Sequence, residues 1–151
     1  GLTGNVTDEW QVSLGYGHQD ARVVSTDAAF NPRQPFLTDV GKVNPSVPRN
    51  TFSYWNRYDL SSFVGGGPGV LGVGAGVIYA SSFYPSLDNR VIVPGYARVD
   101  GALFVKVTEN ISGQLNIENL TGAYYYASAH NNNNIMPGAP RSAYVTVNAR
   151  F

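Results

Sequence analysis

Few side chains in this sequence could carry out catalysis or hold a metal ion. The two histidines, His18 and His130, lie far apart, and the 151-residue chain has no cysteine. Zinc sites are built from closely spaced histidine, cysteine and carboxylate ligands, so we expect no metal site. No Ser/His/Asp set and no pair of carboxylates stands out. The sequence therefore predicts neither enzyme activity nor a cofactor.

Aromatic side chains are the more distinctive candidates for contact with a ligand. They occur as three consecutive tyrosines and as a Phe–Tyr pair: Tyr124, Tyr125, Tyr126, Phe83 and Tyr84. Successive side chains of an extended segment point to opposite faces, so the three tyrosines cannot all face the same way. Aromatic rings also gather where a membrane meets water, and for the three tyrosines that use is slightly favoured over ligand contact.

The elements that position these residues are predicted by hydrophobic alternation. In Ser142–Phe151, apolar residues alternate with polar ones over about ten positions, the length of a tilted transmembrane β-strand. Similar patterns predict six earlier strands, the first of them partial: Leu2–Asn5, Trp10 to about Val24, Asn50–Leu60, Gly69–Ser81, Tyr96–Thr108 and Gly113–Leu120. The fold class expected is all-β.

The connections between these strands alternate in length. Three are long, at residues 25–49, 83–95 and 121–141, and they would all lie at one end of an antiparallel meander. Outer-membrane β-barrels have short periplasmic turns and long outer loops, as this order requires. Seven strands with open edges cannot stand alone in lipid. We therefore expect an up-and-down transmembrane β-barrel of which this chain is the C-terminal fragment, without the early strands.

Composition agrees with a barrel wall and excludes other classes. Only 13% of residues are charged, and the ten basic residues balance the ten acidic ones, so nothing favours nucleic acid as a partner. The sequence has no run of about 18 apolar residues, so it predicts no transmembrane helix. The segment Gly67–Gly72 has the glycine spacing of a dinucleotide-binding loop, but its period-two continuation favours a turn leading into a strand.

Several motifs follow one another in the last third of the chain: Leu115–Leu120, then Tyr124–Tyr125, Pro137–Arg141 and the terminal Phe151. In this order they resemble the late barrel of TonB-dependent siderophore receptors, and they carry the strongest likeness. Earlier segments with the same likeness are 47–60, 72–77, 93–96 and 99–100. The family commonly reads Asn-Leu-Phe-Asp where this chain has Asn119-Leu120-Thr121-Gly122, a small departure.

The resemblance implies a 22-stranded barrel with an N-terminal plug in the outer membrane of a Gram-negative bacterium. Its implied partners are a ferric siderophore, the TonB complex acting through the plug, outer-membrane lipid and the barrel assembly machinery. Iron would enter only as a bound ferric chelate. Phe151 would serve barrel closure and assembly.

The resemblance also implies ligand contacts from outer-loop and inner-wall aromatics, with at least one of the three tyrosines facing inward. The candidates are Tyr124, Tyr125 and Tyr126, with Phe83, Tyr84 and Phe36 as weaker ones. His130 is predicted to be a solvated loop residue, and its contact with ligand is the second interpretation. Loop arginines could attract an anionic chelate, although isolated ones are usually solvated: Arg33, Arg90 and Arg141.

Three alternatives remain at this point. A receptor of the same family could take another large ligand such as cobalamin. A passive porin-like channel would share the strands but lack the plug and TonB dependence. A soluble β-sandwich with a binding loop would bury its apolar face inside the protein rather than in lipid.

Overall fold

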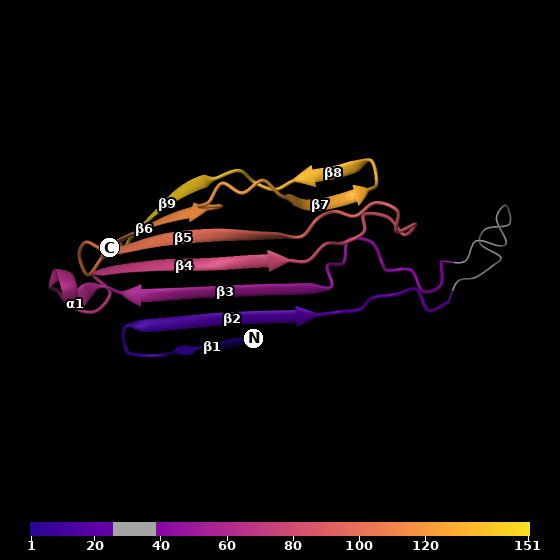
Figure 1. Cartoon of the computed structure of the whole chain (residues 1–151). Coiled ribbons are helices and arrows are strands. Elements are labelled where there is room, and N and C mark those ends of the chain that lie inside the picture. The colour runs from indigo at the N-terminus through magenta and orange to yellow at the C-terminus, as the bar shows by residue number, and fades with distance from the viewer. Residues whose placement is uncertain (26–38) are drawn as a thin grey trace.

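A computed structural model describes residues 1–25 and 39–151 of the chain. Seven strands form one antiparallel sheet in the order β1-β2-β3-β4-β5-β6-β9, and a two-stranded hairpin, β7-β8, stands apart from it (Figure 1). The sheet strands are β1 (Leu2–Asn5), β2 (Trp10–His18), β3 (Asn50–Asp59), β4 (Leu71–Ala80), β5 (Tyr96–Lys106), β6 (Ile111–Glu118) and β9 (Ser142–Ala149). The hairpin strands are β7 (Tyr126–Asn131) and β8 (Asn134–Pro137), and α1 is a single helical turn (Ser61–Val64).

The register of the sheet sorts side chains onto two faces. Leu14 pairs with Tyr54, Tyr54 with Val77, and Val77 with Val99. Directly paired residues share a face, so these rows form what we call the apolar face; it also holds Val73, Leu103, Leu115, Ile117 and Val145. The opposite, polar face carries Trp55, Arg57, Arg98, Asp100, Phe104, Gln114, Asn116 and Glu118.

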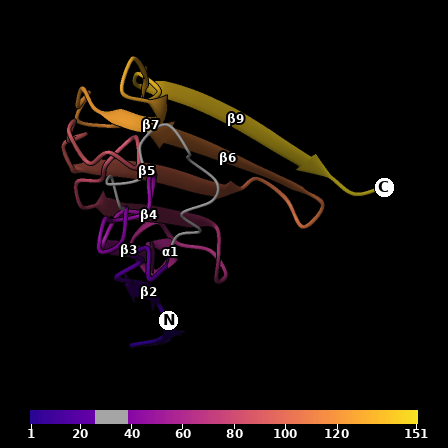
Figure 2. The same cartoon turned by 90° about the vertical axis from the view of Figure 1, so that its right-hand side faces the viewer.

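The sheet has no second layer packed on either face among the described residues. Among the described residues, the buried apolar side chains lie beyond the strands' apolar face, in or next to the loops: Phe83, Pro85, Val93 and Tyr125. Large residues of the apolar face stay open, with Val145 74% exposed. Figure 2 shows the sheet as a curved wall that runs from β1 and β2 to β9. Such a wall needs an apolar environment on one side and fits a barrel rather than a sandwich.

Short turns and long connections lie at opposite ends of the sheet (Figure 1). The turns β1–β2 and β5–β6 are four residues each, at 6–9 and 107–110, while the segments after β2, β4 and β6 run toward the other end. The predicted meander, with all its long connections on one side, is therefore confirmed. The described residues include no helix long and apolar enough to cross a membrane.

Several strand ends and two short elements differ from the sequence prediction. The strand from Trp10 ends at His18 rather than near Val24, because β3 begins at Asn50 and offers no partner beyond it; Arg22 makes only an isolated bridge to Val43. The last strand ends at Ala149, although the Arg150 amide still donates to the Asn110 carbonyl (2.9 Å). The hairpin β7-β8 and the turn α1 were not predicted, since neither segment alternates over a strand's length.

Candidate ligand-binding site

The long connections at one end of the sheet enclose a cavity of about 340 Å³. It lies between the segment after β2 and the β4–β5 connection, and it is lined by Gln19, Asp20, Ala21, Arg22, Val43, Val47, Arg49, Asn50, Ser81, Ser82, Phe83 and Tyr84. Two of the predicted ligand-contact residues, Phe83 and Tyr84, therefore line one cavity. None of the other predicted contacts belongs to its described lining.

Two arginines and one aspartate line this cavity, so its lining carries a net positive charge. The Asp20 carboxylate lies 2.8 Å from the Arg22 guanidinium and 3.6 Å from that of Arg49. All three side chains are about half exposed, so solvent screens these pairs and they add little to stability. Two guanidinium groups sharing one carboxylate leave donors free to receive an anionic or carbonyl-rich ligand. Sequence patterns did not single out these two arginines, because they flank a long irregular segment.

The aromatic pair at the cavity has two different roles. Phe83 is buried and exchanges both backbone hydrogen bonds with Val93, at 3.1 and 2.9 Å, which folds the β4–β5 connection back on itself. Tyr84 is half-buried, and its carbonyl accepts a hydrogen bond from the Ser46 amide (2.8 Å). Phe83 thus supports the wall, while Tyr84 keeps part of its ring accessible.

Tyr125 is the inward-facing member of the tyrosine triplet. Its ring stacks on Tyr96, with centroids 4.4 Å apart and planes tilted by 31°, and the Arg98 guanidinium donates to its hydroxyl (3.4 Å). Tyr96 and Arg98 belong to the polar face of β5. The ring also lies against Gly138, where an added Cβ would overlap it. Only glycine leaves room for this stacking.

A chain of polar contacts connects this tyrosine cluster to the start of the β6–β9 connection. The Asp100 carboxylate accepts from Arg98 (2.7 Å) and from the backbone amide of Asn119 (2.9 Å). Asn119 is 1% exposed, and its side chain bonds to both the amide and the carbonyl of Ala123 (2.8 Å each) and donates to the carbonyl of Ala139 (3.2 Å). Asp100 thus holds the end of β6 in place, while Lys106 of the same strand pairs with Glu109 (2.8 Å).

The remaining predicted contacts lie on the surface of the loop end. Tyr124 is 79% exposed and meets Tyr126 edge-on with ring centroids 5.6 Å apart. A side-chain hydrogen bond with Tyr126 stabilises the neutral hydroxyl of Tyr124 and raises its pKa above the usual 10.0. His130 is exposed in β7. These three residues could contact a ligand only from outside the loop cavity.

The weaker candidates separate in the same way. Arg90 is exposed and its backbone amide donates to Asp88 (3.2 Å), while the Arg141 guanidinium lies against Gly122. Phe36 and Arg33 lie outside the described residues. In the part of the chain that the structure describes, no group of three His, Cys, Asp or Glu side chains could hold a metal ion.

Comparison with known proteins decides the family. A model of the barrel of TonB-dependent receptors, described as "TonB dependent receptor-like, beta-barrel", matches residues 1–120. The chain belongs to the TonB-dependent receptor family. Proteins of this family are β-barrels of the Gram-negative outer membrane, so the predicted fold class and location are confirmed.

The relatives of this TonB-dependent receptor chain are named as receptors rather than enzymes. The probable TonB-dependent siderophore receptor PiuA of Acinetobacter baumannii is 30% identical over all of the chain and 20% of its own length. The catecholate siderophore receptor Fiu of Escherichia coli K12 is 31% identical over 99% of the chain and 19% of its own length. The chain thus spans about a fifth of these relatives.

Solved structures of TonB-dependent receptors show the same fold. The crystal structure of PiuA from A. baumannii superposes with a TM-score of 0.79 at 28% identity, covering 97% of the chain and 20% of that protein. The closed form of Fiu gives a TM-score of 0.73 at 28% identity over 99% and 20% of the respective chains. A seven-stranded wall that covers a fifth of such proteins is consistent with the expected 22-stranded barrel.

Proposed function

We propose that this chain is the C-terminal barrel section of an outer-membrane receptor that imports a ferric siderophore with energy from TonB. The observation that carries the proposal is the match of nearly the whole chain, at about 30% identity, to proteins named as siderophore receptors. The part of the receptor that fills the barrel and reaches TonB would be a plug domain encoded before this section.

The loop end offers the chemistry that an iron chelate needs. Arg22 and Arg49 supply positive charge for an anionic chelate, and Tyr84 supplies a ring face beside them. Tyr124 and Tyr126 present further rings outside the cavity. Iron stays inside its chelator, so the receptor needs no metal ligands of its own.

Burial divides the predicted contacts into two groups. Tyr84, Tyr124, Tyr126 and His130 keep accessible surface and are proposed to touch the chelate; Phe83 and Tyr125 are buried and are proposed to shape the wall behind them.

The two faces of the sheet suggest the remaining partners. The apolar face, with exposed Val73, Leu103 and Val145, would contact outer-membrane lipid. The polar face, with Arg57, Gln114 and Asn116, would face the plug and water. The terminal segment with Phe151 would be recognised by the barrel assembly machinery.

Uptake of labelled iron, and of labelled cobalamin, tests this function directly. The full-length receptor containing this chain is produced in a strain that lacks its own siderophore receptors, with and without TonB. Ferric catecholate, ferric hydroxamate and cobalamin are offered at nanomolar concentration. TonB-dependent iron uptake from one chelate class is expected. Uptake that continues without TonB would favour the passive channel, and uptake of cobalamin alone would replace the siderophore with another ligand.

The same assay tests the aromatic contacts. A variant with Tyr124, Tyr125 and Tyr126 all changed to Ala should bind the chelate more weakly while still assembling in the membrane. Unchanged affinity would leave these tyrosines as interface aromatics.

A further inference from the structure

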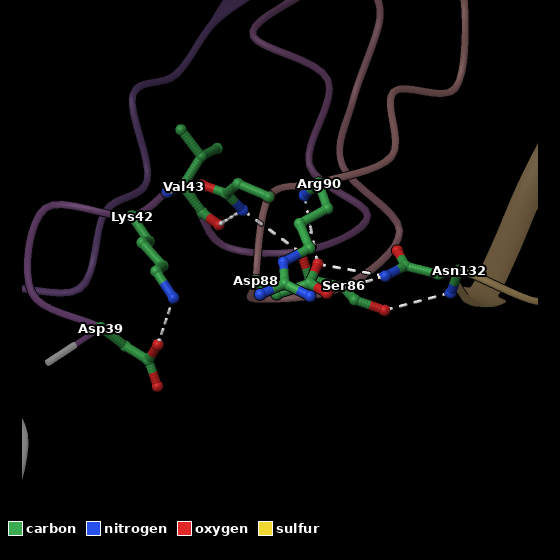
Figure 3. A network of polar contacts seen from close by, with 8 residues as sticks. Asp39, Lys42, Val43, Ser86, Asp88, Arg90 and Asn132 are labelled. Carbon is green, nitrogen blue, oxygen red and sulfur yellow. Dashed lines mark hydrogen bonds and ion pairs between the residues drawn. The ribbon is translucent and has the colours of Figure 1, made fainter. Parts of the chain in front are cut away.

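Asparagine side chains tie together the three long connections at the loop end (Figure 3). The segments involved are 39–47 before β3, 84–90 between β4 and β5, and the hairpin β7-β8, and we call them together the loop unit. Each pair of these segments shares at least one hydrogen bond that involves a side chain or a loop backbone group. Segments more than 40 residues apart in the chain thereby lie side by side.

Asn89 joins the first two segments. Its side chain accepts from the Val43 amide (2.8 Å) and donates to the Val43 carbonyl (3.0 Å), as a neighbouring strand would. The Asn89 backbone has φ 55°, a left-handed conformation that asparagine tolerates better than other residues with a Cβ. The side chain also donates to the Ser86 carbonyl (3.2 Å), so its orientation is fixed from both ends.

Asn132 joins the second segment to the tip of the hairpin. Its side-chain amide donates to both carboxylate oxygens of Asp88, at 3.1 and 2.9 Å, and its backbone amide donates to the Ser86 hydroxyl (3.1 Å). Ser46 joins the first segment to the other two. Its amide donates to the Tyr84 carbonyl (2.8 Å), and its hydroxyl donates to the Ala129 carbonyl in β7 (3.2 Å).

These contacts end at the walls of the loop cavity. Val43, held by Asn89, and Tyr84, held by Ser46, both line it from opposite connections. The buried apolar side chains next to this cavity, Phe83, Pro85 and Val93, all belong to the β4–β5 connection. The Asn89 contacts join that connection to the segment before β3 and so help to set the shape of the cavity.

We propose that Asn89 and Asn132 are positioning residues that hold the loop unit in one arrangement and so shape the cavity before a ligand arrives. The proposed function supplies only the identity of the ligand; the role of the two asparagines in the ligand-free receptor does not depend on it. Preorganisation lowers the entropy that binding must otherwise remove, so loss of either asparagine weakens capture without touching the ligand. Transport after capture does not involve these residues.

Hydrogen–deuterium exchange on the ligand-free full-length receptor tests the coupling. Asn132→Ala is expected to speed exchange at 39–47 and 84–90 as well as in the hairpin, although Asn132 contacts only the middle segment. Asp88→Ala removes the carboxylate that accepts from Asn132, so it should speed exchange in the same three segments. Asn133→Ala is the matched control. Asn133 is the next residue in the same turn, and its backbone amide donates to the Asn131 side chain (2.9 Å), a bond that the substitution leaves in place. Faster exchange confined to the substituted segment would overturn the proposal.

A second measurement separates positioning from a general structural role. If the variant leaves about a tenth of receptors in the binding-competent arrangement, the concentration of ferric tris-catecholate for half-maximal uptake rises about tenfold while the maximal rate is unchanged. A fall in the maximal rate alone, or the same half-maximal concentration as Asn133→Ala, would contradict positioning. If the wild-type receptor takes up no ferric chelate, the proposed function fails, and the exchange pattern still decides whether the loop unit exists.

Discussion

At the scale of single residues, the loop end depends on small or conformationally tolerant side chains. Asn119, with φ 52°, and Asn89, with φ 55°, adopt left-handed backbone conformations and then use their amides to hold neighbouring backbone groups. Gly138 leaves room for the ring of Tyr125. None of these tasks could be predicted from the sequence, because each depends on a partner that is distant in the chain or unmarked by any local pattern. The tyrosine triplet, in contrast, could be recognised as important from its composition alone.

Gly138 offers a sharp test of the tyrosine cluster. In Gly138→Ala, the new methyl group would overlap the Tyr125 ring and displace it from Tyr96, at a cost of about 1–3 kcal/mol for overpacking. Faster hydrogen exchange at 122–141 in the full-length receptor would report this loss. Gly67→Ala is the control, because nothing lies within 4 Å of an added Cβ there. Combining Gly138→Ala with Tyr125→Ala should cost less than the sum of the two changes.

The pH dependence of the loop unit follows from Asp88. The side-chain hydrogen bond from Asn132 is the main reason that the pKa of Asp88 lies below its usual 3.8, followed by the bond from the Arg90 amide. A lowered pKa in the folded protein stabilises the contact above pH 3.8 and loses that stabilisation as pH falls through the lower folded value. Exchange at 129–132 should therefore stay constant from neutral pH to about 4 after correction for the intrinsic rate, and rise only below it. A transition near pH 6 would contradict this assignment, and Asp88→Asn should remove the dependence.

At the scale of elements, alternation predicted every strand of the sheet but not the hairpin. Strands β4, β5 and β9 separate an apolar face from a polar one, so their sequences repeat with period two. The pairing of β7 with β8 contains two register shifts, and its segments are only six and four residues long, so no clear period exists to detect. The Asn132-Asn133 pair between them was the available signal, since polar turn residues favour tight hairpins.

The last strand carries a prediction about assembly. Phe151 lies beyond the end of β9 at Ala149 and is fully exposed in this sheet, so it does not stabilise the sheet itself. Phe151→Asp should reduce the amount of folded receptor in the outer membrane, measured as the heat-modifiable band in gel electrophoresis. Phe63→Asp changes an aromatic residue that is 75% exposed in α1 and serves as the control. Equal amounts of both variants would remove the assembly role from Phe151.

At the scale of the whole molecule, the sheet of the described residues is a single wall with one apolar and one polar face. The sequence could predict this fold well because successive side chains of a strand point to opposite faces. The environment of each side chain therefore depends on its position in the local alternation. The ligand site could be predicted only in part. Its cavity arises where the segment after β2 meets the β4–β5 connection, and the place of Arg22 and Arg49 in the lining and the contact of Asn89 with Val43 depend on that meeting rather than on any pattern around them.

Two neighbouring residues of β6 test which face meets lipid. Ile117 lies on the apolar face between Gly101 and Ala143, and Asn116 lies on the polar face between Ala102 and Tyr144. An arginine near the middle of the lipid-facing surface costs about 2–4 kcal/mol, whereas one facing the lumen costs little. Ile117→Arg should therefore lower the folded fraction and the urea midpoint of the full-length receptor in phospholipid vesicles, and Asn116→Arg should leave both near the wild-type values. The reverse order would mean that the faces are assigned the wrong way round, because the two substitutions add the same side chain one position apart in the same strand.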